Sequence, residues 1–230
     1  RMTRADTLTT SVIFDQNPET VVTHRATEID DENGLRACTM VFSGENRAYF
    51  VDEKGSDVHQ LTTITTRATE FATPDSMPAK LPPNSAFTYC VDLRVDNARK
   101  VRFEKPVMVW VDNFLGFEVG EAVPAGYYDE DRNVWVAAQN GVVVMLLDGD
   151  GDGIADGLDA DGDGVADDLD QDGSYRGEVA GLEDPGNYPP GATFWRVPVT
   201  HFSAWDFNWP FGISVDAISP NAGGSSSADQ

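Results

Sequence analysis

The chain is short of cysteine, of basic residues and of long apolar runs. Its 230 residues include two cysteines, three histidines, and 16 lysines and arginines against 39 aspartates and glutamates, so the formal net charge is −23. A surface this acidic repels polyanions, and we expect neither nucleic acid nor anionic membranes as partners. The longest apolar run, Gly141–Leu147, is far shorter than the roughly 18 residues that a membrane-spanning helix needs, so we expect no membrane insertion.

Motifs of several enzyme classes are also missing. The chain holds no glycine-rich phosphate loop, no zinc-ligand spacing and no dinucleotide-binding fingerprint. Both cysteines, Cys38 and Cys90, lie in strand-like segments, where one disulfide and two buried thiols are equally open. A cysteine hydrolase would need a cysteine at a helix start or in an electropositive pocket, which an acidic chain of strands does not favour.

The most regular feature is an acidic run from Asp148 to Asp172, with eleven aspartates and no lysine or arginine. It repeats every eleven residues, as DGDGDGIADGL from Asp148 and DADGDGVADDL from Asp159. Calcium binds about six to eight oxygens, and carboxylates at positions 1, 3, 5 and 9 of a loop, with a backbone carbonyl at position 7, can surround one ion. Gly153 and Gly164 occupy position 6, where a sharp turn favours a residue without Cβ.

This spacing predicts two calcium sites in which position 12 of one loop is position 1 of the next. A solvated acidic linker needs the charge but not the fixed phase with glycine, and an EF-hand pair needs flanking helices and a closing glutamate. A third repeat begins at Asp170 and Asp172 and decays at Ser174. The predicted ligands are Asp148, Asp150, Asp152, Asp156 and Asp159 with the Ile154 carbonyl, and then Asp159, Asp161, Asp163, Asp167 and Asp170 with the Val165 carbonyl.

Short strand-like segments make up most of the remaining pattern, and helical periodicity is scarce. The clearest alternation puts Tyr89, Val91, Leu93 and Val95 on one face, which is typical of a half-buried strand. The expected strands are Leu8–Phe14, Val21–Arg25, Leu35–Phe42, Ala48–Val51, Val58–Thr65, Ala68–Ala72, Phe87–Val95, Pro106–Val111, Asn133–Ala138, Gly141–Leu147 and Thr193–Val199.

The strands predict an all-β fold, an antiparallel β-sandwich of one or two subdomains with an inserted calcium-binding, Asp-rich loop. Asn140-Gly141 predicts a hairpin turn, and we expect the acidic loop between that last hairpin and a final strand. The terminal sequences suggest a segment of a longer polypeptide. The expected parts are a first group of strands (1–77), a second group (78–147), the insertion (148–175), a final strand with a His-Phe-Ser motif (176–212) and a flexible linker (213–230).

The tripeptide His201-Phe202-Ser203 resembles the cleavage site of self-cutting domains, namely the ZU5-UPA region of death-domain proteins and the FIIND of inflammasome sensors. In those families a serine hydroxyl attacks the carbonyl of the preceding phenylalanine, and water opens the resulting ester. The resemblance implies that Ser203 is the nucleophile, that Phe202 gives the carbonyl, and that His201 is the nearest base or polariser. The alternative is an ordinary strand whose aromatic side chains, from Phe202 to Trp209, are core residues.

Other segments carry further resemblances. GLRACTMVF from Gly34 resembles the opening of a ZU5 sandwich, and the acidic run resembles thrombospondin type 3 calcium repeats. Four segments resemble the region before the repeats of bacterial Rhs/YD-repeat proteins, which are large secreted or surface polypeptides. These segments are MPAKLPPNSAFTY from Met77, NFLGFEVG from Asn113, VPAGYYD from Val123 and HFSAWDFNWPFG from His201.

Together the resemblances imply a calcium-stabilised autoproteolytic module that cuts its own chain between Phe202 and Ser203 by an N-to-O acyl shift. Its expected cofactor is Ca²⁺, and its expected partners are the remainder of a larger polypeptide and its own cleaved fragment. We expect it outside the cell or on the surface, where calcium is abundant. The alternatives are a non-catalytic calcium-binding structural or adhesion module and a carbohydrate-binding module that stacks sugars on the aromatic side chains from Phe194 to Phe211.

Overall fold

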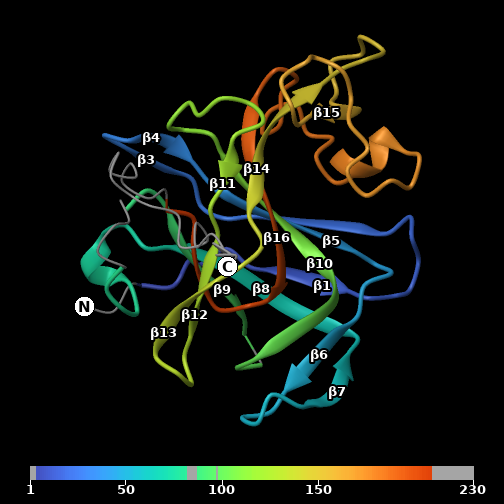
Figure 1. Cartoon of the computed structure of the whole chain (residues 1–230). Coiled ribbons are helices and arrows are strands. Elements are labelled where there is room, and N and C mark those ends of the chain that lie inside the picture. Colours follow the sequence, from blue (N-terminus) through green and yellow to red (C-terminus); the bar gives the residue numbers. More distant parts are fainter. Residues whose placement is uncertain (1–3, 82–86, 97, 209–230) are drawn as a thin grey trace, which may run out of the picture.

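Strands with alternating apolar residues form nearly all of the regular structure (Figure 1). The computed structural model describes residues 4–81, 87–96 and 98–208. Within these residues the helices are two 3-10 turns, η1 (Pro74–Ser76) and η2 (Tyr175–Val179), and no helix is long and apolar enough to span a bilayer. The strands are β1 (Thr10–Ile13), β2 (Val21–Arg25), β3 (Ile29–Asp31), β4 (Gly34–Arg36), β5 (Cys38–Ser43), β6 (Ala48–Val51), β7 (Asp57–Leu61), β8 (Thr63–Glu70), β9 (Cys90–Val95), β10 (Val101–Asp112), β11 (Ala122–Val123), β12 (Gly126–Asp129), β13 (Val134–Ala137), β14 (Gly141–Leu147), β15 (Gly157–Asp159), β16 (Thr193–His201) and β17 (Ala204–Asp206).

The strands form two large antiparallel sheets and a separate β3-β4 hairpin, which confirms the predicted all-β sandwich. Sheet A has the order β1-β8-β9-β17-β12-β13. Sheet B has the order β11-β14-β16-β10-β5-β2, with β15 added beside β14 and the β6-β7 hairpin added beside β10. Strands from before and after residue 78 pair with each other in both sheets, as β8 with β9 and β5 with β10. The two groups of strands therefore share one sandwich.

The main core lies between the two sheets and is built from the inward face of each strand. Sheet A contributes Tyr89, Leu93 and Trp205, and sheet B contributes Met40 and Trp195, all of them almost fully buried. Because side chains alternate along a strand, the four residues predicted to share one face of β9 do lie together in this core. Burial at roughly 25 cal/mol per Å² of apolar surface makes this layer the main source of stability.

A second core covers the outer face of sheet B. Residues between β14 and β16 fold back over the sheet as the yellow-to-orange lobe of Figure 1. Leu158, Val179 and Leu182 from this lobe pack against Trp110 and Phe194 of the sheet. Sheet B is therefore buried on both faces at its centre, which explains why β14 is a continuous apolar run instead of an alternating one.

The outer face of sheet A carries a third, smaller cluster. Phe71, Met77, Cys90 and Ala204 are buried there, and Trp135 packs against them. Cys38 belongs instead to the main core, so the two cysteines lie on opposite faces of sheet A and both are free thiols. Of the two alternatives left open by the sequence, the structure therefore has buried thiols and no disulfide between Cys38 and Cys90.

The predicted strands differ from the observed ones at several boundaries. Val58–Thr65 was expected to be one strand, but residue 62 separates β7 from β8, and β8 continues to Glu70. β10 begins five residues before Pro106, which lies at an irregularity in the pairing with β16 where the register shifts between Arg102 and Val107. A proline has no N–H to donate and is tolerated at such a position. β3, β11, β12, β15 and β17 were not predicted.

The hairpin predicted at Asn140-Gly141 is wrong. β13 belongs to sheet A and β14 to sheet B, so the intervening residues cross from one sheet to the other. A Cβ on Gly141 would collide with the backbone carbonyl oxygen of Arg196 in β16. The glycine is therefore required by the close approach of two strands, which local sequence does not reveal. The acidic insertion does lie between two paired strands, β14 and β16.

Candidate functional site

The acidic run begins directly after β14, and each of its first two loops is wound around one aspartate. Asp148 accepts hydrogen bonds from the backbone N–H groups of Gly151 (2.6 Å) and Gly153 (2.9 Å). Asp159 accepts the equivalent bonds from residues 162 (2.7 Å) and 164 (2.8 Å). All four donors are glycines with φ between 78° and 87°, a conformation that other L-residues adopt at a cost. The eleven-residue repeat of the sequence therefore corresponds to a repeated backbone conformation.

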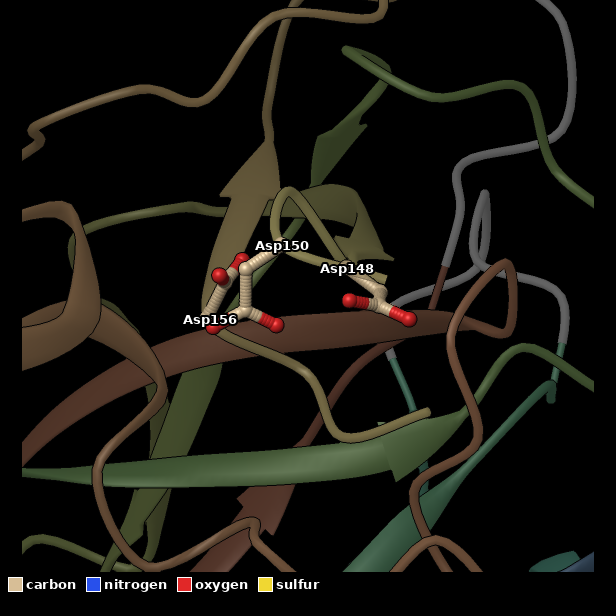
Figure 2. Close-up of side chains that lie close together, drawn as sticks. All are labelled: Asp148, Asp150 and Asp156. Carbon is tan, nitrogen blue, oxygen red and sulfur yellow. The ribbon is translucent and has the colours of Figure 1, made fainter. Parts of the chain in front are cut away.

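Within each loop, the aspartate at position 9 folds back toward position 1. Asp156 accepts a hydrogen bond from the N–H of Gly149 at 2.8 Å, and Asp167 accepts one from the N–H of Ala160 at 2.7 Å. These bonds bring carboxylates from both ends of a loop together, as Figure 2 shows for the first loop. Three groups result, each with carboxylate oxygens within 4.8 Å of one another: Asp148, Asp150 and Asp156; Asp159, Asp161 and Asp167; and Asp168, Asp170 and Asp172.

The groups differ in detail from the predicted ligand sets. Asp152 and Asp163, at position 5, lie outside the groups, and each accepts a hydrogen bond from the N–H two residues ahead, at 2.8 Å in both loops. Asp159 lies with the second group and not with the first. The carbonyls of Ile154 and Val165 remain predicted ligands.

The third group begins at Asp168, two residues before the predicted start. The N–H of Gly173 donates to Asp168 at 2.8 Å, which repeats the bond between positions 6 and 1 of the first two loops. The signal was present in the sequence as Asp168-x-Asp170-x-Asp172-Gly173. It was hidden because Asp168 follows Asp159 by nine residues instead of eleven, and a strict period of eleven places the start at Asp170.

The possible metal ligands in all three groups are carboxylate oxygens, and each group could hold a metal ion. Hydrogen bonds from Gly153, Gly151 and Asp152 hold the pKa of Asp148 below its usual value. Burial opposes ionisation of Asp159, but the N–H groups of residues 162 and 164 outweigh it and lower its pKa too. Hard oxygen ligands without sulfur or nitrogen suit Ca²⁺ or Mg²⁺, and the long loops suit the larger and more flexible calcium shell.

A buried ion pair ties the third loop to sheet B. Glu178, in η2, accepts a hydrogen bond from the backbone N–H of Asp170 at 2.7 Å and pairs with Arg196 of β16. The Glu178 and Arg196 side chains are only 2% and 11% exposed. Arg196 also lies over the ring of Trp110, 5.7 Å from the ring centroid and within the reach of about 6 Å for a cation–π contact. The loop is therefore anchored to the strand that leads to His201.

His201-Phe202-Ser203 forms the crossover from sheet B to sheet A. His201 ends β16 and Ala204 begins β17. The N–H of Phe202 donates to the carbonyl of Val101 in sheet B at 3.2 Å, whereas the carbonyl of Ser203 accepts from Leu93 in sheet A at 3.0 Å. The two residues on either side of the Phe202-Ser203 bond are thus held by different sheets.

The three side chains of the crossover point to different surroundings. Phe202 is buried in the main core, with its ring centroid 4.7 Å from that of Phe103. Ser203 Oγ lies 3.4 Å from His201 Nε2, at the outer limit of a hydrogen bond. The His201 ring packs edge-on against Tyr127 at 4.4 Å, and burial lowers its pKa while the charge of Asp129 opposes that shift. A neutral imidazole beside a hydroxyl is the form that accepts a proton.

A cavity of about 410 Å³ opens beside the crossover. Its walls include His201, Phe202 and Ser203 from the crossover, and Tyr127 and Asp129 from β12. The cavity therefore borders the residues on both sides of the Phe202-Ser203 bond. Another cavity, of about 290 Å³, lies near Cys38 and Tyr89.

The comparisons with known proteins place no name on this site. No family model, no curated protein and no solved structure matches the chain. The resemblances of the sequence to ZU5, FIIND, Rhs and thrombospondin repeats therefore remain predictions.

Aromatic side chains of the C-terminal segment lie in the core. Trp195, Trp205 and Phe207 are at most 2% exposed, and Phe194 packs in the second core. None of these four offers a face on which a sugar could stack. Trp209 and Phe211 lie outside the described residues, as does the linker expected at residues 213–230.

Proposed function

We propose that the chain is a calcium-stabilised β-sandwich module that cuts its own backbone between Phe202 and Ser203. The observation that carries the cleavage is the 3.4 Å contact between Ser203 Oγ and His201 Nε2 at a crossover whose two sides are held by different sheets. The observation that carries the metal is the set of three carboxylate groups in loops of one repeated shape. The two features are connected by a single strand, because β16 runs from the end of the acidic insertion to His201.

The proposed cleavage is an N-to-O acyl shift followed by hydrolysis. Ser203 Oγ attacks the carbonyl carbon of Phe202, and its proton passes to His201 Nε2. The carbon–nitrogen bond of the peptide breaks as that proton is delivered to the nitrogen of Ser203, which leaves an ester between Phe202 and the serine oxygen. Water from the cavity then opens the ester. The products are a chain that ends at Phe202 and a chain that begins at Ser203.

Calcium is the metal we propose for the acidic groups. Its role is structural, because binding cancels the repulsion among carboxylates that lie two residues apart in an insertion packed on sheet B. For one site with free calcium at 100 times its dissociation constant, the linkage stabilises the fold by about 2.7 kcal/mol. The resemblance to Rhs proteins further supports a place outside the cell, within a larger polypeptide that would carry the cleaved fragment.

The deciding experiment is a mass measurement on denatured protein after incubation at neutral pH, combined with peptide mapping of the Phe202-Ser203 region. We expect a new carboxyl terminus at Phe202 and a new amino terminus at Ser203, both abolished by Ser203→Ala and retained by Ser203→Cys, which keeps a nucleophile. Ser43→Ala, at another half-buried strand end, is the matched control. An uncut bond in the wild-type protein would leave the non-catalytic calcium-binding module as the function.

Calcium binding is tested separately. Calcium is added to protein from which a chelator has removed bound metal, and thermal unfolding is followed at constant ionic strength. A higher melting temperature in calcium than in chelator is expected, with a smaller effect of magnesium. Equal melting curves would contradict calcium binding. The cleavage would still be decided by the mass measurement alone. Comparing cleavage in calcium and in chelator then shows whether the metal acts on the crossover through β16.

A further inference from the structure

One arginine of the insertion lies on the first carboxylate group. Arg176, in η2, donates from Nη2 to Asp150 Oδ2 at 3.3 Å, and the same nitrogen lies 3.6 Å from Asp156 Oδ2. Both aspartates belong, with Asp148, to the first of the three groups, and Figure 2 shows their carboxylates close together. A single cationic nitrogen therefore bridges two of the three carboxylates in that group.

The two oxygens that Arg176 contacts are those without a backbone donor of the loop. Asp156 Oδ1 accepts the N–H of Gly149 at 2.8 Å, and Asp150 Oδ1 accepts the N–H of Asp152 at 3.3 Å. The second oxygen of each carboxylate keeps its lone pairs open to a cation. Calcium binds such oxygens at about 2.3–2.6 Å, so Arg176 and a metal ion compete for the same two atoms.

The second loop repeats this geometry without an arginine. Asp161 Oδ1 accepts the N–H of Asp163 at 3.1 Å, and Asp167 Oδ2 accepts the N–H of Ala160 at 2.7 Å, as at the same positions of the first loop. Within the part of the chain that the structure describes, no ion pair involves a carboxylate of the second group. The guanidinium is therefore a difference between two loops of one repeated shape.

The charges and the exposure of this contact favour exchange with a metal ion. Three carboxylates within 4.8 Å repel one another, and one guanidinium offsets part of that repulsion. The side chain of Arg176 is 70% exposed, so its ion pairs contribute little to stability. Calcium carries twice the charge and binds several oxygens at once, and it repels a guanidinium at such short range.

The backbone of η2 stays in place when the Arg176 side chain moves. Glu178 of the same turn pairs with Arg196 of β16 and accepts the N–H of Asp170 at 2.7 Å. Those contacts are made by the opposite end of the turn and involve no carboxylate of the first group. Displacement of the guanidinium therefore requires rotation of one exposed side chain and no change in the anchor.

We propose that Arg176 is a built-in competitor of calcium at the first carboxylate group. In the calcium-free chain its guanidinium offsets the charge of Asp150 and Asp156, and calcium displaces it on binding. The arginine therefore lowers the calcium affinity of the first group and stabilises the empty loop. This inference rests on the proposed role of calcium, and it adds a residue that sets the affinity of one site.

The test is a calorimetric calcium titration of the metal-free full chain at low ionic strength, for the wild-type protein and for Arg176→Gln. Loss of the guanidinium should tighten the first site roughly two- to fivefold, the range expected for one exposed ion pair. Arg132→Gln is the matched control, because Arg132 is also 70% exposed and its partner, Asp129, lies outside the acidic run. The gain should shrink at high salt, which screens exposed charges.

Two backgrounds assign the gain to the first site. Asp161→Asn weakens the second group and leaves the first intact, so the gain from Arg176→Gln should persist there. Asp150→Asn removes a ligand of the first group, so the gain should disappear from the titration. Arg176→Lys keeps the positive charge and should stay closer to the wild-type affinity than Arg176→Gln does.

Thermal unfolding gives a second measurement. In chelator, Arg176→Gln should melt below the wild-type protein, because the empty carboxylates lose their counter-ion. In saturating calcium the two proteins should melt together, because the guanidinium is displaced in the wild type. An unchanged or lower calcium affinity of Arg176→Gln would overturn the inference and leave the metal role of the loops standing. A wild-type chain that binds no calcium would overturn both.

Discussion

The acidic loops are shaped by hydrogen bonds between residues close in sequence, whereas the His201–Ser203 crossover is held by hydrogen bonds to residues far away in sequence. In the first two loops, the hydrogen bonds that shape the carboxylate groups join residues no more than seven positions apart. At the crossover, the bonds come from Val101 and Leu93, about a hundred residues away in sequence. A local arrangement can be repeated by copying a short motif, whereas a non-local one exists only in the assembled sandwich.

The difference also decides how each region responds to change. A local loop can lose its shape without unfolding the sheets, unless something ties it to them. The tie in this molecule is Glu178, which bonds to the third loop and to β16 at once. Mutations at the tie, within the loops and on the sheets should therefore have effects of different size.

The largest effect is expected from Glu178→Gln, which leaves the charge of Arg196 buried and unpaired. Removing one partner of a buried ion pair costs about 3–5 kcal/mol. Urea unfolding measures the loss, and Glu104→Gln is the matched control, because its pair with Arg47 is about half exposed and should contribute little to stability. Equal losses would mean that the insertion is not anchored through Glu178, and Glu178→Gln with Arg196→Met should recover part of the stability.

The next effect is a pH dependence that comes from Asp206. Its folded pKa of about 7 lies above the unfolded value of 3.8, so the unfolded chain releases the proton first as pH rises. Stability from this group is therefore intact below about pH 4, falls as pH rises to 7 and is then constant, a loss of at most about 4 kcal/mol.

The measurement compares unfolding free energies at pH 5 and pH 8 for the wild-type protein and for Asp206→Asn. The difference between the two proteins should grow with pH in favour of the asparagine variant. A constant difference would show that Asp206 ionises normally in the folded chain.

Asp159→Asn and Asp163→Asn compare two positions of one loop. Asp159 is fully buried and accepts several backbone N–H groups, so its replacement should cost about 1–3 kcal/mol and weaken calcium binding at least tenfold. Asp163 is exposed and lies outside the carboxylate group, so its replacement should stay within about 0.5 kcal/mol. Equal losses of calcium affinity would favour the ligand set predicted from the sequence.

The smallest effect concerns loop shape alone. Gly153 has a φ of 87° and open space around the position of a Cβ, so Gly153→Ala should cost about 1 kcal/mol through backbone strain and not through a clash. Gly153→Asn should cost less, since asparagine tolerates this conformation better. Thermal unfolding in calcium ranks the three proteins, and a larger loss for asparagine would point to a steric cause instead.

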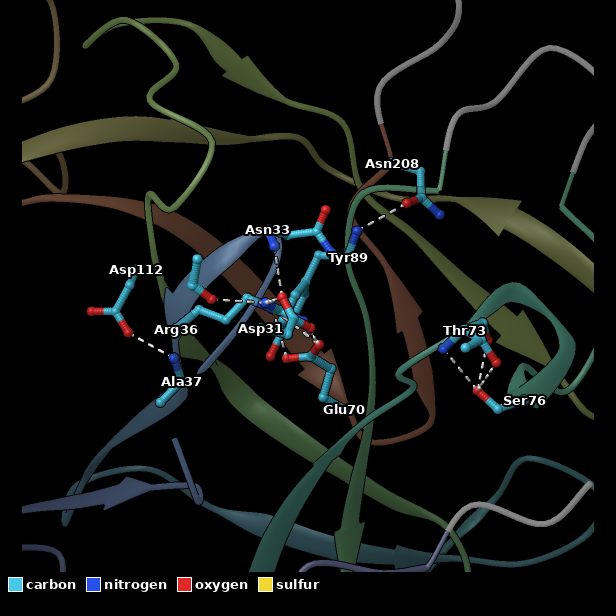
Figure 3. Close-up of polar contacts among 11 residues, drawn as sticks. Asp31, Asn33, Arg36, Ala37, Glu70, Thr73, Ser76, Tyr89, Asp112 and Asn208 are labelled. Carbon is cyan, nitrogen blue, oxygen red and sulfur yellow. Dashed lines mark hydrogen bonds and ion pairs between the residues drawn. The ribbon is translucent and has the colours of Figure 1, made fainter. Parts of the chain in front are cut away.

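Much of the fold followed from the sequence because strand alternation and turns are local. β2, β6 and β14 have the predicted bounds, and Tyr89 to Val95 share the predicted buried face. β17 was missed because its three residues carry no pattern of their own and are a strand only through pairing with β9 and β12. The Asn140-Gly141 turn was misassigned because the same dipeptide can occur in a hairpin and in a crossover between two sheets. The bonds of Asn208 to the backbone of Tyr89, drawn in Figure 3, likewise join segments that no local pattern relates.

The sequence by itself determined the three acidic loops, since their glycines and aspartates shape the backbone through bonds to near neighbours. It also determined the β class, because alternation of apolar residues needs only the pleat of a strand. The tertiary structure alone decided that Ser203 meets His201 at a crossover, that Glu178 reaches Arg196, and that Thr88 lies against Asn208. Those contacts depend on which strands become neighbours, and that choice is made by burial of the whole core and not by any short stretch of chain.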